Sequence, residues 1–471
     1  ADAQARMFLP SVRYSADLPA PVDPVRQAPA WRSVVSRAVA AARGSRGDGP
    51  GPVHLDIGFS DPLTPSPDAF PVTATGLTRV PESVAPQPVP LPRGPRTLVL
   101  AGDDPDPATG EAARELAESA GWPLLAEPSS GARSGERAVG PYRLLLDEPD
   151  LGGAVERVVA VGRPTLSRPV TALLARQDVA LVHLTAHEDD PGPDPARTAR
   201  RVVVPATASP QHLLTGAAGA GAGAGAVEDG VWLATWQRAG AAAQAAVDGV
   251  LDADAGAGRL TGPLVAREVA AALGRRPGEL LVAAASNAVR DLDLAAAPWT
   301  GPSAAGPSGD APRVLAGRGL SGIDGTLSTA TGAALAAGTP TTVLIGDLAL
   351  LHDANGLLLP PGEPEPDLRV VLLDDDGGGI FTGLEHGDPG APDRAAVFER
   401  LFGTPHGRDL VVLASALGVA ARRVDDADDL RTCLAAPVRG REVLVVRADR
   451  ADLRVLHARV RAAVSDAVRQ V

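Results

Sequence analysis

The sequence contains no lysine, so all 44 of its basic residues are arginines. This absence excludes Schiff-base chemistry and the lysine of a Walker A phosphate-binding loop. The single cysteine, Cys433, excludes an internal disulfide framework and any zinc or iron–sulfur site with several cysteine ligands. Aromatic residues make up only 3%, so the hydrophobic cores must be built from alanine, valine and leucine.

The charge balance and the hydropathy pattern exclude further classes of protein. A net charge of −13 over 471 residues disfavours nucleic-acid binding, which needs clustered cations. No apolar run reaches the length of a membrane span, and no signal-peptide pattern opens the sequence. We therefore predict a cytoplasmic protein with no nucleic-acid partner and no membrane insertion.

Short apolar strands alternate with helical stretches along most of the sequence. This alternation predicts an α/β fold in which parallel sheets are flanked by helices. A nearly pure run of glycine and alanine at 216–226 predicts a flexible surface loop. The predicted segments are an incomplete first domain at 1–65, a proline-rich linker at 66–95, a central α/β domain at 96–250 and a last α/β domain at 251–471.

Acidic residues follow two of the apolar strands in the last domain. Gly346-Asp347 follows the strand at 341–345, and Asp374-Asp375-Asp376-Gly377 follows the strand at 368–373. Open parallel sheets bind ligands beyond the carboxyl ends of their strands. Two carboxylates there suit Mg²⁺ that also holds a diphosphate. In a second interpretation, Asp347 caps a helix and the aspartate triplet forms a solvated turn.

A glycine-rich loop at 317–325 precedes a helix predicted at 326–337. Glycines let backbone amides approach a ligand, and the amino end of a helix favours anions. Alone, such a loop is typical of any strand-to-helix turn.

Several of these motifs together resemble the 2-succinyl-5-enolpyruvyl-6-hydroxy-3-cyclohexene-1-carboxylate synthase family of thiamine-diphosphate enzymes. The stretches that resemble it are SNAVRDLD (286–293), GRGLSGIDGTLSTATG (317–332), GDLALLHDANGLLL (346–359), DDDGGGIFTGLEHG (374–387), GPVHLDIGFSDPL (51–63), LAEPSSGARSG (125–135) and GRPTLSRPV (162–170). The resemblance implies a thiamine-diphosphate-binding fold, in which 1–65 is the end of the pyrimidine-binding domain and 251–471 is the diphosphate-binding domain.

The resemblance also implies a cofactor site. Asp347, Asp375 and the carbonyl of Gly377 would bind Mg²⁺ or Mn²⁺, which anchors thiamine diphosphate. The cofactor-binding residues that it implies are Ser321, Gly322, Ile323, Gly346, Asp347, Leu348, Asp375, Ile380 and Phe381. The family often has asparagine in place of Asp375, and an asparagine commonly stands in place of Gly317.

The reaction that the resemblance implies is the decarboxylative addition of 2-oxoglutarate to isochorismate in menaquinone biosynthesis. Both substrates are polyanions, so guanidinium groups that grip carboxylates are expected at the site. Arg290, Arg318 and Arg168 are the candidates, with Ser286 as a hydrogen-bonding neighbour. A homodimer or homotetramer with its active site at a subunit interface is expected. His406 and the other histidines are interpreted as packing or hydrogen-bonded residues.

Ala1–Leu63 resembles only the last portion of the family's first domain. The glutamate that promotes cofactor activation in the family therefore has no counterpart in the sequence. Two interpretations remain open, a fragment or incomplete gene model of an active synthase and a truncated paralogue that binds without catalysis. The 471-residue chain is accordingly expected to bind Mg²⁺-diphosphate weakly and not to decarboxylate 2-oxoglutarate. An acetolactate-synthase-like carboligase, a nucleotide-binding regulatory protein and a degenerate partner subunit also stay open as functions.

Overall fold

A computed structural model describes residues 4–44, 49–64, 91, 95–104, 106–185, 194, 197, 199–203, 224–299, 311–387 and 394–471. Contacts divide the chain into unit 1 (Ala1–Val89, Leu184–Gly192 and Arg201–Ala208) and unit 2 (Pro90–His183, Pro193–Arg200 and Ser209–Val471). Of the linker predicted at 66–95, only Leu91 and Pro95 are among the described residues. Within these ranges, no helix has both the length and the apolar character that a membrane span requires.

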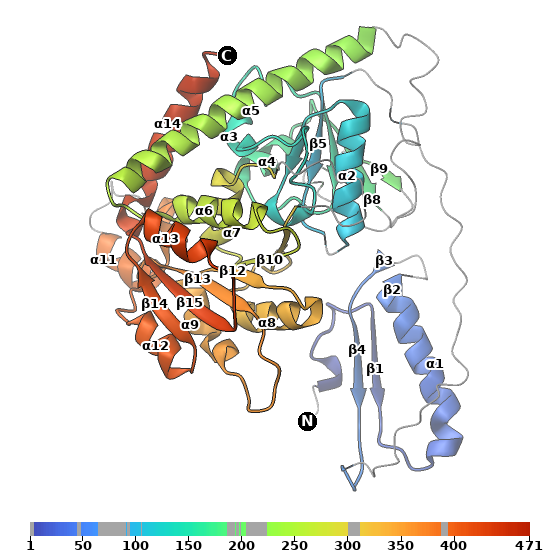
Figure 1. The fold of residues 1–471 in the computed structure, drawn as a ribbon. Coiled ribbons are helices and arrows are strands. Elements are labelled where there is room, and N and C mark those ends of the chain that lie inside the picture. The colour runs from blue at the N-terminus through green and yellow to red at the C-terminus, as the bar shows by residue number, and fades with distance from the viewer. Residues whose placement is uncertain are drawn as a thin grey trace. The chain divides into compact units, whose positions relative to one another are not determined.

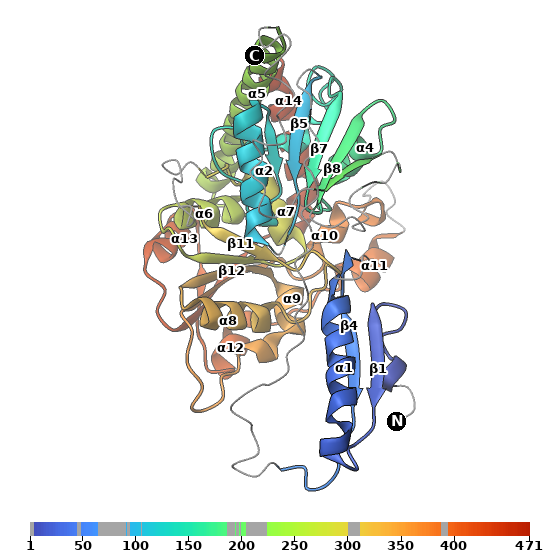
Figure 2. The ribbon, with the colours of Figure 1, turned by 90° about the vertical axis from the view of Figure 1, so that its right-hand side faces the viewer.

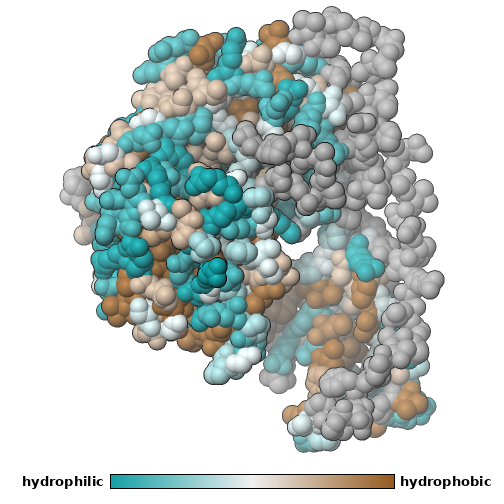
Figure 3. Space-filling model, viewed as in Figure 1, coloured by the Kyte–Doolittle hydropathy of each residue, from teal (hydrophilic) through white to brown (hydrophobic). Residues whose placement is uncertain are grey.

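Unit 1 contains a strand–helix–strand motif. Strands β1 (Tyr14–Leu18) and β4 (Val53–Ile57) pair in parallel, and helix α1 (Pro24–Ala42) lies between them in sequence. The side chain of Asp23 caps α1 by accepting a hydrogen bond from the backbone N–H of Arg26. Strands β2 (Arg43–Gly44) and β3 (Gly49–Pro50) form a short antiparallel pair. Hydrophobic residues are prominent on the part of unit 1 that Figure 3 shows.

The first sheet of unit 2 has the strand order β6-β5-β7-β8 (Figure 1). Its strands are β5 (Thr97–Ala101), β6 (Leu124–Ala126), β7 (Arg157–Val161) and β8 (Ala180–Thr185). Strand β9 (Arg200–Val203) lies mostly in the residues that the contacts assign to unit 1. Strand β5 is parallel to both β6 and β7. The helices in this part of the chain are α2 (Pro107–Ala120), α3 (Tyr142–Leu145), α4 (Arg168–Leu174) and α5 (Ala224–Gly256), with the short 3-10 helix η2 (Pro128–Ser130).

The second sheet of unit 2 has the order β11-β10-β12-β13-β15-β14, and every pair in it is parallel. Its strands are β10 (Leu280–Ala283), β11 (Arg313–Ala316), β12 (Thr341–Gly346), β13 (Leu368–Asp374), β14 (Ala420–Val424) and β15 (Arg441–Arg447). The helices around it are α6 (Gly262–Gly274), α7 (Asn287–Ala295), α8 (Thr326–Ala337), α9 (Asp347–His352), α10 (Gly379–Thr382), α11 (Ala395–Phe398), α12 (Leu410–Ala416), α13 (Ala427–Ala435) and α14 (Leu453–Val468).

Both faces of this sheet are covered by helices, as Figures 1 and 2 show. In β10, Leu281 packs into the core that contains α6, α7 and α13, whereas Val282 packs into the core that contains α8, α9 and α12. Because successive side chains point to opposite faces, a strand between two helical layers must be apolar throughout. This confirms the predicted α/β fold with parallel sheets flanked by helices.

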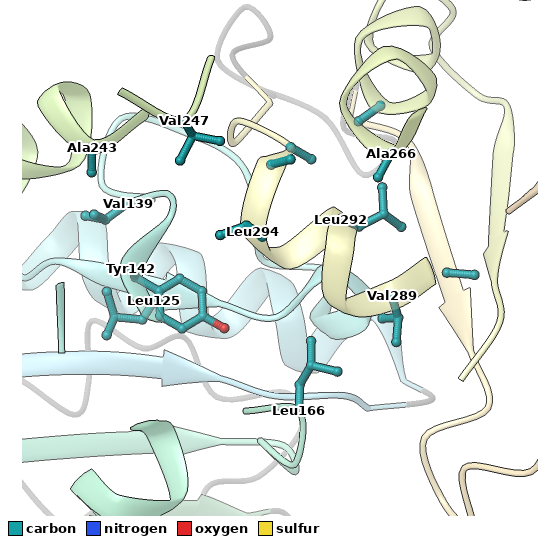
Figure 4. Packing of buried hydrophobic residues seen from close by; sticks show 14 of the residues in the cluster. Leu125, Val139, Tyr142, Leu166, Ala243, Val247, Ala266, Val289, Leu292 and Leu294 are labelled. Carbon is teal, nitrogen blue, oxygen red and sulfur yellow. The ribbon is translucent and has the colours of Figure 1, made fainter. Parts of the chain in front are cut away.

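One hydrophobic core joins the two sheets of unit 2. Tyr142 and Leu166 from the first sheet's region belong to the same cluster as Val289 and Leu292 of α7 (Figure 4). Helix α5 runs without a break across residue 250, where a domain boundary is predicted, and it packs along α14. The described end of the glycine–alanine run, 224–226, is the first turn of α5 and not a loop. The domain boundaries themselves stay a prediction.

Replacing Leu372 by alanine should destabilise unit 2. Leu372 is 0% exposed in the central strand β13, so the substitution removes buried methyl groups and leaves a cavity. We expect a loss of about 2–5 kcal/mol in the free energy of unfolding. Urea unfolding followed by circular dichroism measures this change. Leu358, which is 53% exposed, provides the control, because Leu358→Ala should leave the midpoint nearly unchanged. Equal shifts for the two variants would contradict the core assignment.

Candidate functional site

Two acidic residues follow the ends of neighbouring parallel strands. Strands β12 and β13 pair with Gly346 opposite Leu373. Asp347 begins α9 directly after β12, and Asp375 follows the last residue of β13. The parallel register therefore brings the two carboxylates to the same edge of the sheet, where open sheets bind their ligands.

A cavity at this edge is lined by residues from both strand ends, from the start of α7 and from the glycine turn after β13. The sequence-predicted residues that line it are Ser286, Ile323, Gly346, Asp347, Leu348, Asp375, Gly377, Ile380 and Phe381. The remaining predicted residues, which do not line it, are Arg168, Arg290, Arg318, Ser321 and Gly322. The acidic motifs and the hydrophobic pair thus surround one cavity, and the arginines lie elsewhere.

Asp347 is buried and held by several donors. Its side chain is 2% exposed, and its Oδ2 accepts hydrogen bonds from the backbone N–H of Gly377 (2.8 Å) and from Nε2 of His406 (3.0 Å). Its Oδ1 accepts from the N–H of Leu348 at 2.6 Å. Burial raises the pKa of Asp347, and these hydrogen bonds oppose the rise because they stabilise the charged form.

Asp375 has no hydrogen bond to its carboxylate among the described residues. Burial and the negative charge of Asp347 together raise its pKa to about 8, and the Arg450 guanidinium opposes the rise. Two buried carboxylates that repel each other are the donor set that a divalent cation relieves, because a bound cation favours the ionised form of both. The residues present therefore fit a hard cation such as Mg²⁺, whose preferred ligands are oxygens.

Within the described residues, a different group has ligand atoms that all lie within 4.8 Å of one another, namely Asp347, Asp374 and His406. In His406, Nδ1 accepts a hydrogen bond from the backbone N–H of Arg408 at 3.0 Å. The ring proton of a neutral imidazole must then be on Nε2, which donates it to Asp347 and cannot bind a metal. Asp374 is neutralised by Arg447 at 2.9 Å. We therefore favour Asp375, and not Asp374 or His406, as the second side-chain ligand beside Asp347.

The contact between His406 and Asp347 fits the interpretation of His406 as a hydrogen-bonded residue. The sequence did not indicate its partner, since no metal-ligand spacing surrounds the histidine. The two residues are 59 positions apart and meet only through the fold.

A glycine turn brings the chain from β13 into the cavity. Gly377 has φ +138°, and a Cβ atom there would lie 1.9 Å from the carbonyl oxygen of Gly403. Asp376, with φ +56°, accepts hydrogen bonds from the backbone N–H groups of His406 and Gly407. The turn therefore requires a residue without a side chain at Gly377.

Three arginines, Arg143, Arg290 and Arg318, interact with one another next to Ser286. Arg290 Nη1 donates to the carbonyl of Ser286 at 2.8 Å, and Arg143 Nη1 donates to the carbonyl of Arg290 at 3.1 Å. Burial lowers the pKa of Arg290, and the positive charges of Arg318 and Arg143 lower it further. Arg318 is 7% exposed, and its Nε has no hydrogen-bond partner among the described residues. Such a cluster favours an anionic ligand.

Sequence reasoning missed Arg143, because no motif surrounds it and its contact to Arg290 spans 147 positions. Arg168, which the sequence indicated as a substrate-binding candidate, is 74% exposed and pairs with Glu385 at 2.7 Å. Among the described residues, no hydrogen bond or ion pair joins Arg168 to the arginine cluster formed by Arg143, Arg290 and Arg318.

Comparisons with known proteins are informative over nearly the whole chain. A 2-succinyl-5-enolpyruvyl-6-hydroxy-3-cyclohexene-1-carboxylate synthase from Kineococcus radiotolerans is 58% identical, over 99% of this chain and 79% of the relative. A synthase of the same name from Paenarthrobacter aurescens is 43% identical, over 99% of this chain and 77% of the relative. No protein-family model matches the chain.

Solved structures share the fold. Benzoylformate decarboxylase from Polynucleobacter necessarius aligns with a TM-score of 0.54 at 16% identity, covering 95% of this chain and 77% of that chain. A proposed thiamin diphosphate-dependent enzyme from Mycobacterium smegmatis aligns with a TM-score of 0.52 at 18% identity, covering 95% of this chain and 78% of that chain. At such low identity these two likenesses establish the fold alone.

The glycine turn provides a test of the local geometry. Gly377→Ala should destabilise the protein by at least about 1–3 kcal/mol, because the new Cβ would meet the Gly403 carbonyl in a backbone conformation that disfavours side chains. Gly383 is the matched control, since its φ is −77° and a Cβ there meets nothing closer than 3.7 Å. Thermal unfolding measures both variants. Equal melting temperatures for Gly377→Ala and Gly383→Ala would show that the turn is not constrained.

Proposed function

The chain belongs to the family of 2-succinyl-5-enolpyruvyl-6-hydroxy-3-cyclohexene-1-carboxylate synthases, and we propose that its protein catalyses the reaction that this name describes. In this proposal, 2-oxoglutarate loses carbon dioxide and its remaining part is added to isochorismate, as a step of menaquinone biosynthesis. The cofactors are thiamine diphosphate and Mg²⁺ or Mn²⁺.

The observation that best supports this proposal is the position of Asp347 and Asp375 at adjacent strand ends around one cavity. Their carboxylates and the carbonyl of Gly377 would hold the cation, and the cation would hold the diphosphate of the cofactor. Bound thiamine diphosphate supplies the electron sink that decarboxylation of a 2-oxo acid requires. Ile380 and Phe381 line the same cavity and would pack against the cofactor and exclude water.

The arginine cluster supports a substrate with several carboxylates. Arg318 and Arg290 are partly or largely buried, where a guanidinium–carboxylate contact is stronger than in water. The unpartnered Nε of Arg318 is available as a donor to such a carboxylate. Ser286 belongs to the cavity, and its carbonyl is bonded to Arg290, so it would connect the substrate region to the cofactor region.

Replacing Asp347 by alanine should abolish metal-dependent cofactor binding. The unmodified protein is expected to bind thiamine diphosphate with Mg²⁺ and much more weakly with a chelator present. Asp347→Ala should weaken the Mg²⁺-dependent binding by at least about a hundredfold, because it removes a ligand and not merely an outer contact. Calorimetric titration measures both. Asp353→Ala is the control, because the Asp353 carboxylate accepts hydrogen bonds from the backbone N–H and the hydroxyl of Ser328 and does not line the cavity. Equal affinities with and without metal would refute the cation assignment.

Substrate choice should depend on Arg318. A donor panel with isochorismate as acceptor should show a preference for 2-oxoglutarate over pyruvate in the protein that contains this chain. Arg318→Gln should lower kcat/KM for 2-oxoglutarate by about a hundredfold, or roughly 2–3 kcal/mol, and affect pyruvate much less. Arg469→Gln, at a residue 66% exposed on the surface, is the control. A preference for pyruvate would favour an acetolactate-synthase-like carboligase.

Assembly and location are further parts of the prediction. A homodimer or homotetramer with its active site at a subunit interface stays a prediction, which light scattering of the purified protein tests. The cytoplasmic location also stays a prediction.

A further inference from the structure

A glutamate just after β6 is buried within unit 2. Glu127 is 1% exposed. Its Oε1 accepts a hydrogen bond from the backbone N–H of Leu166 at 2.8 Å. Its Oε2 is buried without a hydrogen-bond partner among the described residues. A buried acid with one fixed and one unsatisfied oxygen is costly to the fold, so its presence here calls for an explanation.

Thr165, which precedes Leu166, accepts hydrogen bonds from Arg318. The Nη2 group of Arg318 donates to the backbone carbonyl of Thr165 at 3.2 Å and to its Oγ1 at 3.1 Å. The Nη1 group of the same arginine donates to Oγ of Ser321 at 3.2 Å. Arg318 is therefore oriented from two sides, by its own glycine-rich loop and by the turn at Thr165 that Glu127 fixes.

The charges around Glu127 come from α3, from α7 and from the segments that follow η2 and β11. Asp293 on α7 lies 3.6 Å from Arg133 and 3.7 Å from Arg143. Tyr142 on α3 and Arg318 after β11 also interact electrostatically with Glu127. Arg133 donates to the carbonyl of Ala126, directly before Glu127, at 2.7 Å. The two acids and the three guanidinium groups of this cluster thus restrain both Glu127 and the backbone of Arg290.

The protonation of Glu127 matters for substrate binding. Burial and the charge of Asp293 raise its pKa to about 8, and the hydrogen bond from the Leu166 backbone and the charge of Arg318 oppose the rise. A neutral Glu127 leaves the positive charge of Arg318 available to a ligand carboxylate. An ionised Glu127 would compete with that ligand for the same guanidinium group.

We propose that Glu127 is a positioning residue for the substrate, which holds the Thr165–Leu166 turn and through it orients the Arg318 guanidinium. This inference rests on the proposed function, because it assumes that Arg318 binds a substrate carboxylate. Glu127 itself does not line the cavity between the strand ends.

In the protein that contains this chain, the test compares Glu127→Ala, Glu127→Gln and the surface control Glu118→Ala, whose side chain is 43% exposed on α2. Glu127→Ala should raise KM for 2-oxoglutarate by about tenfold to a hundredfold with a smaller effect on kcat, because Arg318 loses its orientation. Glu127→Gln keeps an acceptor for Leu166 and should restore KM to within about threefold of the unmodified protein at neutral pH. Glu118→Ala should change nothing.

The pH dependence separates positioning from a merely structural role. In the unmodified protein KM for 2-oxoglutarate should rise as pH passes about 8, where Glu127 ionises, and in Glu127→Gln this rise should disappear. Because the folded pKa is raised, the neutral acid's contribution to stability is fully present below pH 4.5 and is lost as pH rises through about 8. The melting temperature of Glu127→Gln relative to the unmodified protein should therefore increase between about pH 5 and about pH 9.

Two results would overturn the proposal. One is an unchanged KM in a Glu127→Ala variant whose melting transition shows that it folds. The other, decisive also if Glu127→Ala does not fold, is an identical dependence of KM on pH in Glu127→Gln and the unmodified protein. Failure of the proposed function looks different, because the unmodified protein would then neither bind thiamine diphosphate with Mg²⁺ nor convert 2-oxoglutarate.

Discussion

The repulsion between two buried carboxylates is the constraint on which the candidate site depends. Asp347 and Asp375 are brought together by the parallel pairing of β12 and β13, and burial penalises the charge of each. Hydrogen bonds from Gly377 and His406 compensate part of this penalty at Asp347. At Asp375 no such bond exists among the described residues, so a bound cation would stabilise its ionised form beyond what the Arg450 guanidinium does. The glycine turn and the cavity are arranged around these two groups.

A second group of charges, of opposite sign, is linked to the cavity through Ser286, whose carbonyl accepts a hydrogen bond from Arg290. Arg290 and Arg318 belong to the last sheet's region, yet their positions depend on Arg143 and Thr165, which precede that region by more than a hundred residues. The anionic and cationic groups are therefore fixed by different parts of unit 2. Under the proposed function this separation would let the aspartates hold a cation with its diphosphate while the guanidinium groups bind substrate carboxylates, so that each charge would have a compensating partner of its own.

Much of the fold and part of the site could be predicted from the sequence, for physical reasons that differ between elements. Strands buried on both faces are largely continuous apolar runs, so β12 and β13 were recognisable from the sequence alone. Strand β14 was missed because it is an edge strand with two arginines and no apolar run. The strand-end aspartates were found by their local motifs. The hydrogen-bond partners of Glu127 and His406 could not be predicted from the sequence, because Leu166 is 39 positions from Glu127 and Asp347 is 59 positions from His406.

The pairing of α5 with α14 also affects how the chain folds during synthesis. Trp236 and Leu251 of α5 belong to the same buried cluster as Leu456 and Val460 of α14, and Arg459 pairs with Asp254 at 2.8 Å. The second sheet of unit 2 separates the two helices in the sequence, so the side of α5 that faces α14 is covered only after α14 has been synthesised and has docked. A folding intermediate that lacks this contact exposes part of the apolar surface of α5, and such transient exposure favours aggregation.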